Sequence, residues 1–177
     1  MKKKLLPLAI AAAMTPGFAA AADVSGFVDV MYNVSSDSAP TTDGSFGANG
    51  EVDFISSPAD GVTTRVDVDL MLDPAAGGNS AVLEQAFFAW SATDDVTVIG
   101  GVFNNPIGQE GDDAPVLWGT NSGVVRNALD SQTALYGNNV AGLAAAGAVG
   151  PATVTVALLN DINGVAEKNS IAAVVNI

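Results

Sequence analysis

The sequence predicts an all-β protein: an antiparallel up-and-down transmembrane β-barrel of about eight strands, either closed or incomplete within this chain. Three observations predict this fold. The chain begins with an apolar leader, its later segments alternate apolar and polar residues, and its connections alternate between long and short. No apolar run after the leader reaches the roughly 18 residues that a transmembrane helix requires, so a membrane span would have to be built from strands.

The leader has the three parts of a secretory signal peptide. Met1–Lys4 is positively charged, Leu5–Ala13 is apolar, and Ala20–Ala22 is a small-residue stretch suited to cleavage. We therefore expect cleavage after Ala22, which divides the chain into a signal peptide (1–22) and an outer-membrane β-barrel domain (23–177).

Short segments bounded by turn residues follow the leader, and alternation along them indicates strands with one apolar and one polar face. Val62–Leu72 has the cleanest pattern, because its odd-numbered positions carry Arg65, Asp67 and Asp69 between apolar or threonine neighbours. Glu51–Ser57 has the weakest. The expected strands are Val24–Val34, Glu51–Ser57, Val62–Leu72, Val82–Ala92, Val96–Phe103, Asn139–Ala148, Ala152–Leu159 and Ser170–Ile177.

The connections between these segments alternate between long and short along the whole chain. This rhythm is typical of an outer-membrane barrel that starts in the periplasm, because such barrels have long outer loops and short periplasmic turns. The expected connections are Ser35–Gly50, Ser57–Gly61, Asp73–Ser80, Thr93–Asp95, Asn104–Asn138, Val149–Pro151 and Asn160–Asn169.

Composition excludes several classes of function. Without the leader, Arg65, Arg126 and Lys168 face 19 acidic residues, a net charge of about −16 that disfavours nucleic acid as a partner. The absence of Cys and His excludes disulfides, thiol nucleophiles, imidazole bases and the usual zinc sites. Glu84 has no partner acid or base in any motif, so we expect no enzymatic activity, no cofactor and no metal.

Several stretches in order along the chain resemble the OmpL-like β-barrel porins of Gram-negative outer membranes. The stretches are Val24–Asp29, Leu83–Trp90 and Ile99–Glu110, with the features Gln85-Ala86-Phe87, Gly100-Gly101, Pro106-Ile107-Gly108 and Trp118. The resemblance implies an outer-membrane location, the lipid bilayer as partner, and passive diffusion of ions and small hydrophilic solutes. It also leaves room for an oligomer. Family members are longer than this chain, which leaves two interpretations open: a truncated reading or a short member.

Charged residues on the third segment are the first candidates for a functional site. If their face lines a lumen, Arg65, Asp67 and Asp69 would help to set ion selectivity. A solvated sheet face with local ion pairing explains them as well. We expect Val66, Val68 and Leu70 to face lipid, so that a lysine at Val68 is costly while one at Asp67 is tolerated.

The longest connection supplies the second group of candidates. It carries Glu110, Asp112 and Asp113, followed by Trp118. We expect this loop to fold inward and favour cations, with Trp118 packed against the wall. The alternative is an outer loop that stays in solution.

Sparse aromatic residues fit either interfacial girdles or core packing. Phe27 and Trp90 lie toward the inner ends of their segments, and Tyr32 and Tyr136 near the outer ends.

Two alternatives to a porin stay open. One is a small structural or adhesive barrel with a plugged lumen, since eight strands close around an interior that side chains fill. The other is a secreted soluble β-sandwich.

Overall fold

The computed structural model describes residues 21–34, 45–73, 78–106, 115 and 139–177. The expected signal peptide lies almost wholly outside these residues. The strands within them are β1 (Asp23–Asn33), β2 (Ser45–Ala59), β3 (Val62–Asp73), β4 (Gly78–Ser91), β5 (Val96–Asn104), β6 (Asn139–Val149), β7 (Ala152–Asn160) and β8 (Asn169–Asn176).

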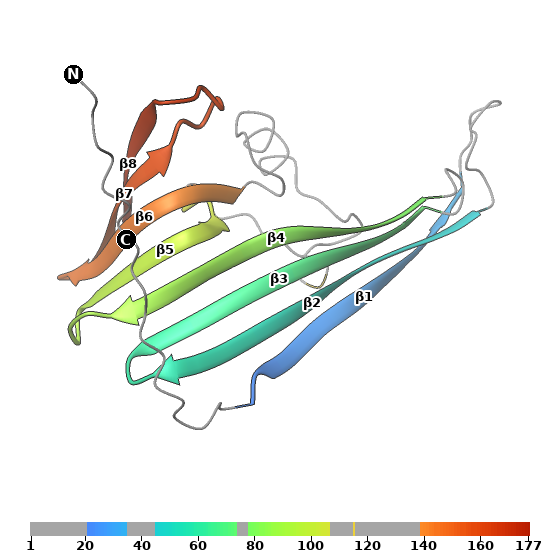
Figure 1. Ribbon diagram of the computed structural model, residues 1–177, viewed down its shortest axis with the longest axis horizontal. Coiled ribbons are helices and arrows are strands. Elements are labelled where there is room, and N and C mark those ends of the chain that lie inside the picture. Colours follow the sequence, from blue (N-terminus) through green and yellow to red (C-terminus); the bar gives the residue numbers. More distant parts are fainter. Residues whose placement is uncertain (1–20, 35–44, 74–77, 107–114, 116–138) are drawn as a thin grey trace, which may run out of the picture.

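All of these strands belong to one antiparallel sheet in which each strand pairs with the next along the chain, in the order β1 to β8. The expected all-β, up-and-down arrangement is therefore confirmed. Figure 1 shows β1 to β4 side by side, after which the sheet bends so that β7 and β8 stand at a steep angle to them. Within the described residues β1 and β8 do not pair with each other, so the sheet is open. None of the described residues forms a helix long and apolar enough to cross a membrane.

Two strands begin earlier than the sequence pattern predicts. β2 starts at Ser45 instead of Glu51, and β4 at Gly78 instead of Val82. Glycine and asparagine in both segments resemble turn signals, but pairing with a long neighbouring strand outweighs this local preference. Longer strands also shorten the β3–β4 connection to 74–77, comparable to 92–95 between β4 and β5, so the expected alternation of connection lengths weakens there.

The sheet has an outer face dominated by exposed apolar side chains, and we call the opposite face, which carries Asp67 and Phe103, the inner face. Large exposed hydrophobic residues occur on every strand. They include Val24, Val28, Val30 and Tyr32 on β1, Phe46 and Phe54 on β2, Val66 and Leu70 on β3, Leu83, Phe88 and Trp90 on β4, Val96 on β5, Leu143 and Val149 on β6, Val156 and Leu158 on β7, and Ile171 and Val175 on β8.

The inner face is divided between two kinds of side chain. Over β5 to β8 it carries a buried apolar cluster with partly buried neighbours, whereas over β2 to β4 it carries charged residues. The apolar cluster consists of Phe103, Val140, Ala144, Ala157 and Leu159, with Phe87, Ile99 and Ala172 packed against it.

A β-bulge in β4 changes which residues reach the inner face. Asp67 pairs with Gln85, but the next residue, Val68, pairs with Leu83, so Glu84 is the extra residue on β4. Two residues of β4 thus oppose one of β3, which is the pattern of a β-bulge. Both Glu84 and Gln85 are buried, at 3% and 7% exposure. The bulge therefore places consecutive polar side chains among the buried residues instead of on opposite faces.

Gly101 allows β4 and β5 to approach closely. Its φ of +131° is a conformation that other residues rarely adopt. A Cβ atom built there would collide with the carbonyl oxygen of Ala86 on β4. A side chain at this position would consequently push the two strands apart.

We predict that Gly101→Ala lowers the free energy of unfolding by roughly 2 kcal/mol or more, because backbone strain and the contact with Ala86 act together. Gly47→Ala is the matched control, since a Cβ atom there meets nothing within 4 Å. The control should leave stability unchanged or raise it by about 0.4–1 kcal/mol. Urea titration of both variants measures the difference, and equal stabilities would contradict the role given to Gly101.

Candidate functional site

The inner faces of β2, β3 and β4 carry a group of charged side chains that we call the charged patch. Strand alternation brings the members on β2 and β3 to one side, and the bulge in β4 adds Glu84. The register sets carboxylates directly opposite carboxylates: Glu51 faces Asp69, and Asp53 faces Asp67. Like charges directly opposite each other destabilise a sheet. The charged patch consists of Glu51 and Asp53 on β2, Arg65, Asp67 and Asp69 on β3, and Glu84 on β4.

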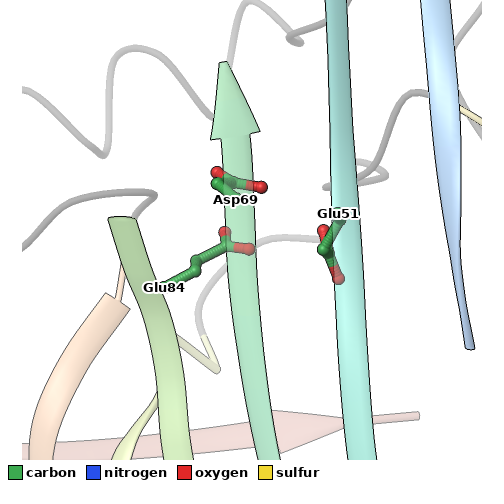
Figure 2. Close-up of side chains that lie close together, drawn as sticks. All are labelled: Glu51, Asp69 and Glu84. Carbon is green, nitrogen blue, oxygen red and sulfur yellow. The ribbon is translucent and has the colours of Figure 1, made fainter. Parts of the chain in front are cut away.

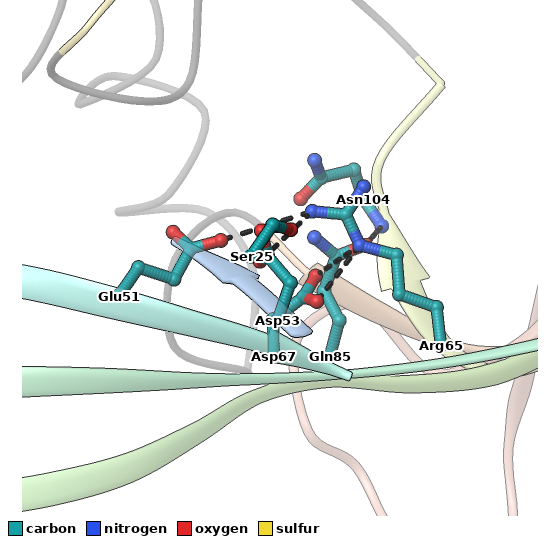
Figure 3. Close-up of polar contacts among 7 residues, drawn as sticks. All are labelled: Ser25, Glu51, Asp53, Arg65, Asp67, Gln85 and Asn104. Atoms are coloured by element: carbon teal, nitrogen blue, oxygen red, sulfur yellow. Dashed lines mark hydrogen bonds and ion pairs between the residues drawn. The ribbon is translucent and has the colours of Figure 1, made fainter. Parts of the chain in front are cut away.

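Arg65 is the cation of this patch and contacts three of its carboxylates (Figure 3). Its Nε donates to both carboxylate oxygens of Asp67, at 2.7 and 2.8 Å. One terminal nitrogen lies 3.3 Å from Asp53 Oδ1 and 3.7 Å from Glu51 Oε1. The guanidinium group presents several donors in one plane, which suits it to bridge carboxylates on two strands. It thus offsets the repulsion that the register creates between β2 and β3.

The burial of its partners makes Arg65 energetically important. The side chain of Asp67 is 0% exposed and that of Glu51 is 3% exposed, whereas Arg65 itself is 33% exposed. Removing one member of a buried ion pair leaves a charge that neither water nor a partner compensates. The stability of this part of the sheet therefore depends on one side chain.

Hydrogen bonds extend the network to the neighbouring strands (Figure 3). On β1, Ser25 Oγ donates to Asp53 Oδ2 at 2.7 Å. On β5, the backbone N–H of Asn104 donates to Gln85 Oε1 at 3.3 Å. Ser25 thus links the charged patch to β1, and Gln85, next to Glu84 in the bulge, links β4 to the backbone of β5.

A second grouping within the charged patch is formed by Glu51, Asp69 and Glu84 (Figure 2). One carboxylate oxygen from each lies within 4.8 Å of the others. Negative charges this close repel each other, so a proton or a cation near them lowers their energy. Carboxylate oxygens are also the ligands that hard cations prefer. In chemical terms this part of the inner face attracts positive charge.

The structure places the sequence-based candidates as follows. Arg65, Asp67 and Asp69 lie together on the inner face, and Arg65 pairs with Asp67. The structure argues against the expectation that Asp67 tolerates a lysine, because Asp67 is fully buried and holds the guanidinium group of Arg65. The loop candidates Glu110, Asp112, Asp113 and Trp118 lie outside the described residues.

Sequence reasoning missed Glu51, Asp53 and Glu84 as members of the patch. A signal for the first two was present, because Glu51 and Asp53 alternate with Val52 and Phe54 as the charges of β3 alternate with valines. Glu84 had no such signal. Only the bulge in β4 places it beside Glu51 and Asp69.

Comparison of this chain with models of known protein families, with curated proteins and with solved structures finds no match. The assignment of function therefore depends on the faces of the sheet and on the charged patch.

We predict that Arg65→Met destabilises the protein by about 1–3 kcal/mol. Loss of one partner from a fully buried pair costs about 3–5 kcal/mol, and the partial exposure of Arg65 reduces this value. The midpoint of urea unfolding measures the effect. Lys168→Met, in the exposed β7–β8 connection, also removes one positive charge and should leave the midpoint unchanged. A similar response of both variants would mean that net charge, and not the contacts of Arg65, sets stability.

Proposed function

We propose that this chain is a porin-like β-barrel protein of the outer membrane of a Gram-negative bacterium, through which ions and small hydrophilic solutes diffuse passively. The observation that carries this proposal is the contrast between the two faces of the sheet. Large apolar side chains are exposed on the outer face of every strand, and charges gather on the inner face. This distribution is the one that lipid outside and water inside would favour.

The outer face is unusually apolar for a surface in water. Val28 near the middle of β1 is 75% exposed and Ile171 on β8 is 80% exposed. Soluble monomers rarely expose continuous apolar patches larger than a few hundred Å². A lipid environment removes this cost, because hydrocarbon chains contact such side chains without ordering water.

Exposed aromatic residues near both ends of the strands also support a membrane position. At one end, the rings of Tyr32 and Phe46 lie 4.7 Å apart, centroid to centroid. At the other end, Trp90 is exposed next to the end of β4. Membrane barrels carry aromatic girdles at both interfaces. Phe27, for which a girdle and core packing were both open, is half-buried and shares the parity of Ser25 and Asp29, which favours packing on the inner face. Tyr136 lies outside the described residues.

The inner face provides charge for a polar path. A hollow of about 840 Å³ lies along β1 to β4, lined by inner-face residues such as Phe27 and Glu51 and also by residues of the outer face such as Val28 and Leu70. Carboxylates outnumber Arg65 in the charged patch beside it. A path lined in this way attracts cations and repels anions.

The topology disfavours a soluble β-sandwich. A sandwich needs two sheets whose apolar faces cover each other, whereas the described strands form one sheet with an uncovered apolar face. The stretches that resemble OmpL-like porins favour the same proposal.

Lysine substitutions on opposite faces of β1 test the membrane position. Val28→Lys should cost roughly 2–4 kcal/mol if Val28 faces lipid near the bilayer centre, and should reduce the yield of membrane-inserted protein. Asp29→Lys, one residue away on the inner face, should insert normally. The measurement is the fraction that resists urea extraction from lipid vesicles and migrates anomalously when unheated. Because Val28 is 75% exposed, a soluble protein would tolerate its replacement by lysine. Normal membrane insertion of Val28→Lys would therefore contradict the proposal.

Ion selectivity tests the role of the charged patch. In planar bilayers under a salt gradient, we expect the reversal potential to show preference for cations. Asp69→Asn should reduce that preference, because it removes one negative charge from the charged patch. Asp60→Asn, in the exposed β2–β3 turn, is the control and should change little. Anion preference, or an equal effect of the control, would rule out the patch as the selective element.

A further inference from the structure

A cavity of about 320 Å³ lies beside the connection between β7 and β8, residues 161–168 (Figure 1). The start of β6 and the end of β7 contribute the rest of its wall. Small-molecule sites have volumes of about 300–1,000 Å³, so this cavity has room for one small ligand. It shares no residue with the charged patch on β2 to β4.

Hydrogen bonds of Asp161 fix the shape of this connection. The backbone carbonyl of Asp161 accepts from the N–H of Gly164 at 2.8 Å, and its Oδ2 accepts from the N–H of Val165 at 2.9 Å. At the base of the connection, the N–H of Ile162 donates to Ser170 Oγ at 3.2 Å. An aspartate that binds the backbone in this way stabilises a turn. This wall of the cavity is therefore formed in the absence of a ligand.

Glu167 lines the cavity in a backbone conformation that favours glycine. Its φ is +65°, and it is the one non-glycine residue of the described part of the chain with a positive φ. Such strain persists only where the surrounding structure imposes it, and strained residues cluster at functional sites. The position of Glu167 at the cavity wall is thus imposed by the connection at an energetic cost.

Two opposite charges lie next to each other in the lining. Glu167 and Lys168 are both exposed, and neither forms an ion pair with another described residue. The carboxylate of Asp161 is already bound to the backbone of Val165. A purely anionic ligand would be repelled by Glu167, and a purely cationic one by Lys168. A ligand with both charges satisfies both side chains.

The remainder of the lining combines amide and aliphatic residues. Asn139 and Asn160 carry amide groups, which can both donate and accept hydrogen bonds. Val140, Ile162 and Val165 are aliphatic. Ligand sites typically pair such apolar surface with a few polar groups that fix orientation. This composition suits a ligand with an aliphatic group beside its charges.

We infer that this cavity binds aliphatic α-amino acids, with the ammonium group of the ligand beside Glu167 and its carboxylate beside Lys168. The cavity lies at the end of the sheet where β1, β3, β5 and β7 end. In the proposed membrane position the longer connections leave the sheet at this end and face the outside. A role in admitting amino acids rests on the proposed function, whereas the binding itself does not.

Titration of the full-length protein in detergent micelles with L-valine, followed by saturation-transfer difference NMR, tests the ligand class. Isovalerate lacks the ammonium group and isobutylamine lacks the carboxylate, while both keep the aliphatic group. We expect saturable binding of L-valine and about tenfold weaker binding of each single-charge probe, because each loses a hydrogen bond to a charged group. Equal binding of either single-charge probe, or no saturable binding of L-valine, would overturn the inference.

Substitutions in the connection test the two charges separately. Glu167→Gln and Lys168→Met should each weaken L-valine binding about tenfold, whereas Lys168→Arg keeps the charge and should bind nearly as tightly as the wild type. The control is Asp60→Asn, which removes a carboxylate from the β2–β3 turn at the opposite end of the sheet. Equal affinities of all four variants would overturn the inference. Unchanged midpoints of urea unfolding distinguish loss of binding from loss of the fold.

Conductance of the same proteins in planar bilayers separates this inference from the proposed function. Conductance without binding of L-valine would contradict the amino-acid site alone. Binding of L-valine by a protein that forms no conducting path would support the site and contradict the proposed function alone.

Discussion

Side chains of successive residues point to opposite faces of a strand, and this constraint determines the arrangement of the whole sheet. With valines, leucines and aromatic residues on one parity, the carboxylates of β2 and β3 are forced onto the other. The antiparallel register then sets Glu51 opposite Asp69 and Asp53 opposite Asp67. The sequence of β2 and β3 therefore concentrates negative charge on the inner face, and Arg65 offsets part of the resulting repulsion by contacting both strands.

Two local features connect this constraint to function. The bulge in β4 buries Glu84 and Gln85 as consecutive residues, which adds a carboxylate beside Glu51 and Asp69 and lets Gln85 bind the backbone of Asn104. The apolar cluster around Phe103 and Ala157 occupies the inner face over β5 to β8. The charge is thus confined to one part of the inner face, where a polar path would run.

Much of this fold was predictable from the sequence, because periodicity specifies it. Arg65, Asp67 and Asp69 alternate with apolar residues, and this pattern identified β3 and the shared face of its charges. The early start of β2 was not predictable, because Gly47, Asn49 and Gly50 resemble a loop until neighbouring strands pair with them. The burial of Asp67 and the position of Glu84 depend on strand register and on a bulge, and these involve residues distant in the sequence, so a local pattern does not report them.

Lipid accessibility along β3 would show which face of the sheet lies against lipid. Single spin labels on introduced cysteines, one at a time from Thr64 to Met71, would be examined in vesicles for collisions with oxygen in lipid and with a water-soluble nickel complex. We predict a period of two, with Val66, Val68 and Leu70 accessible to oxygen and the positions between them accessible to nickel or to neither reagent. Nickel accessibility at Val66, Val68 and Leu70 equal to that of an exposed turn residue such as Asp60 would contradict the account.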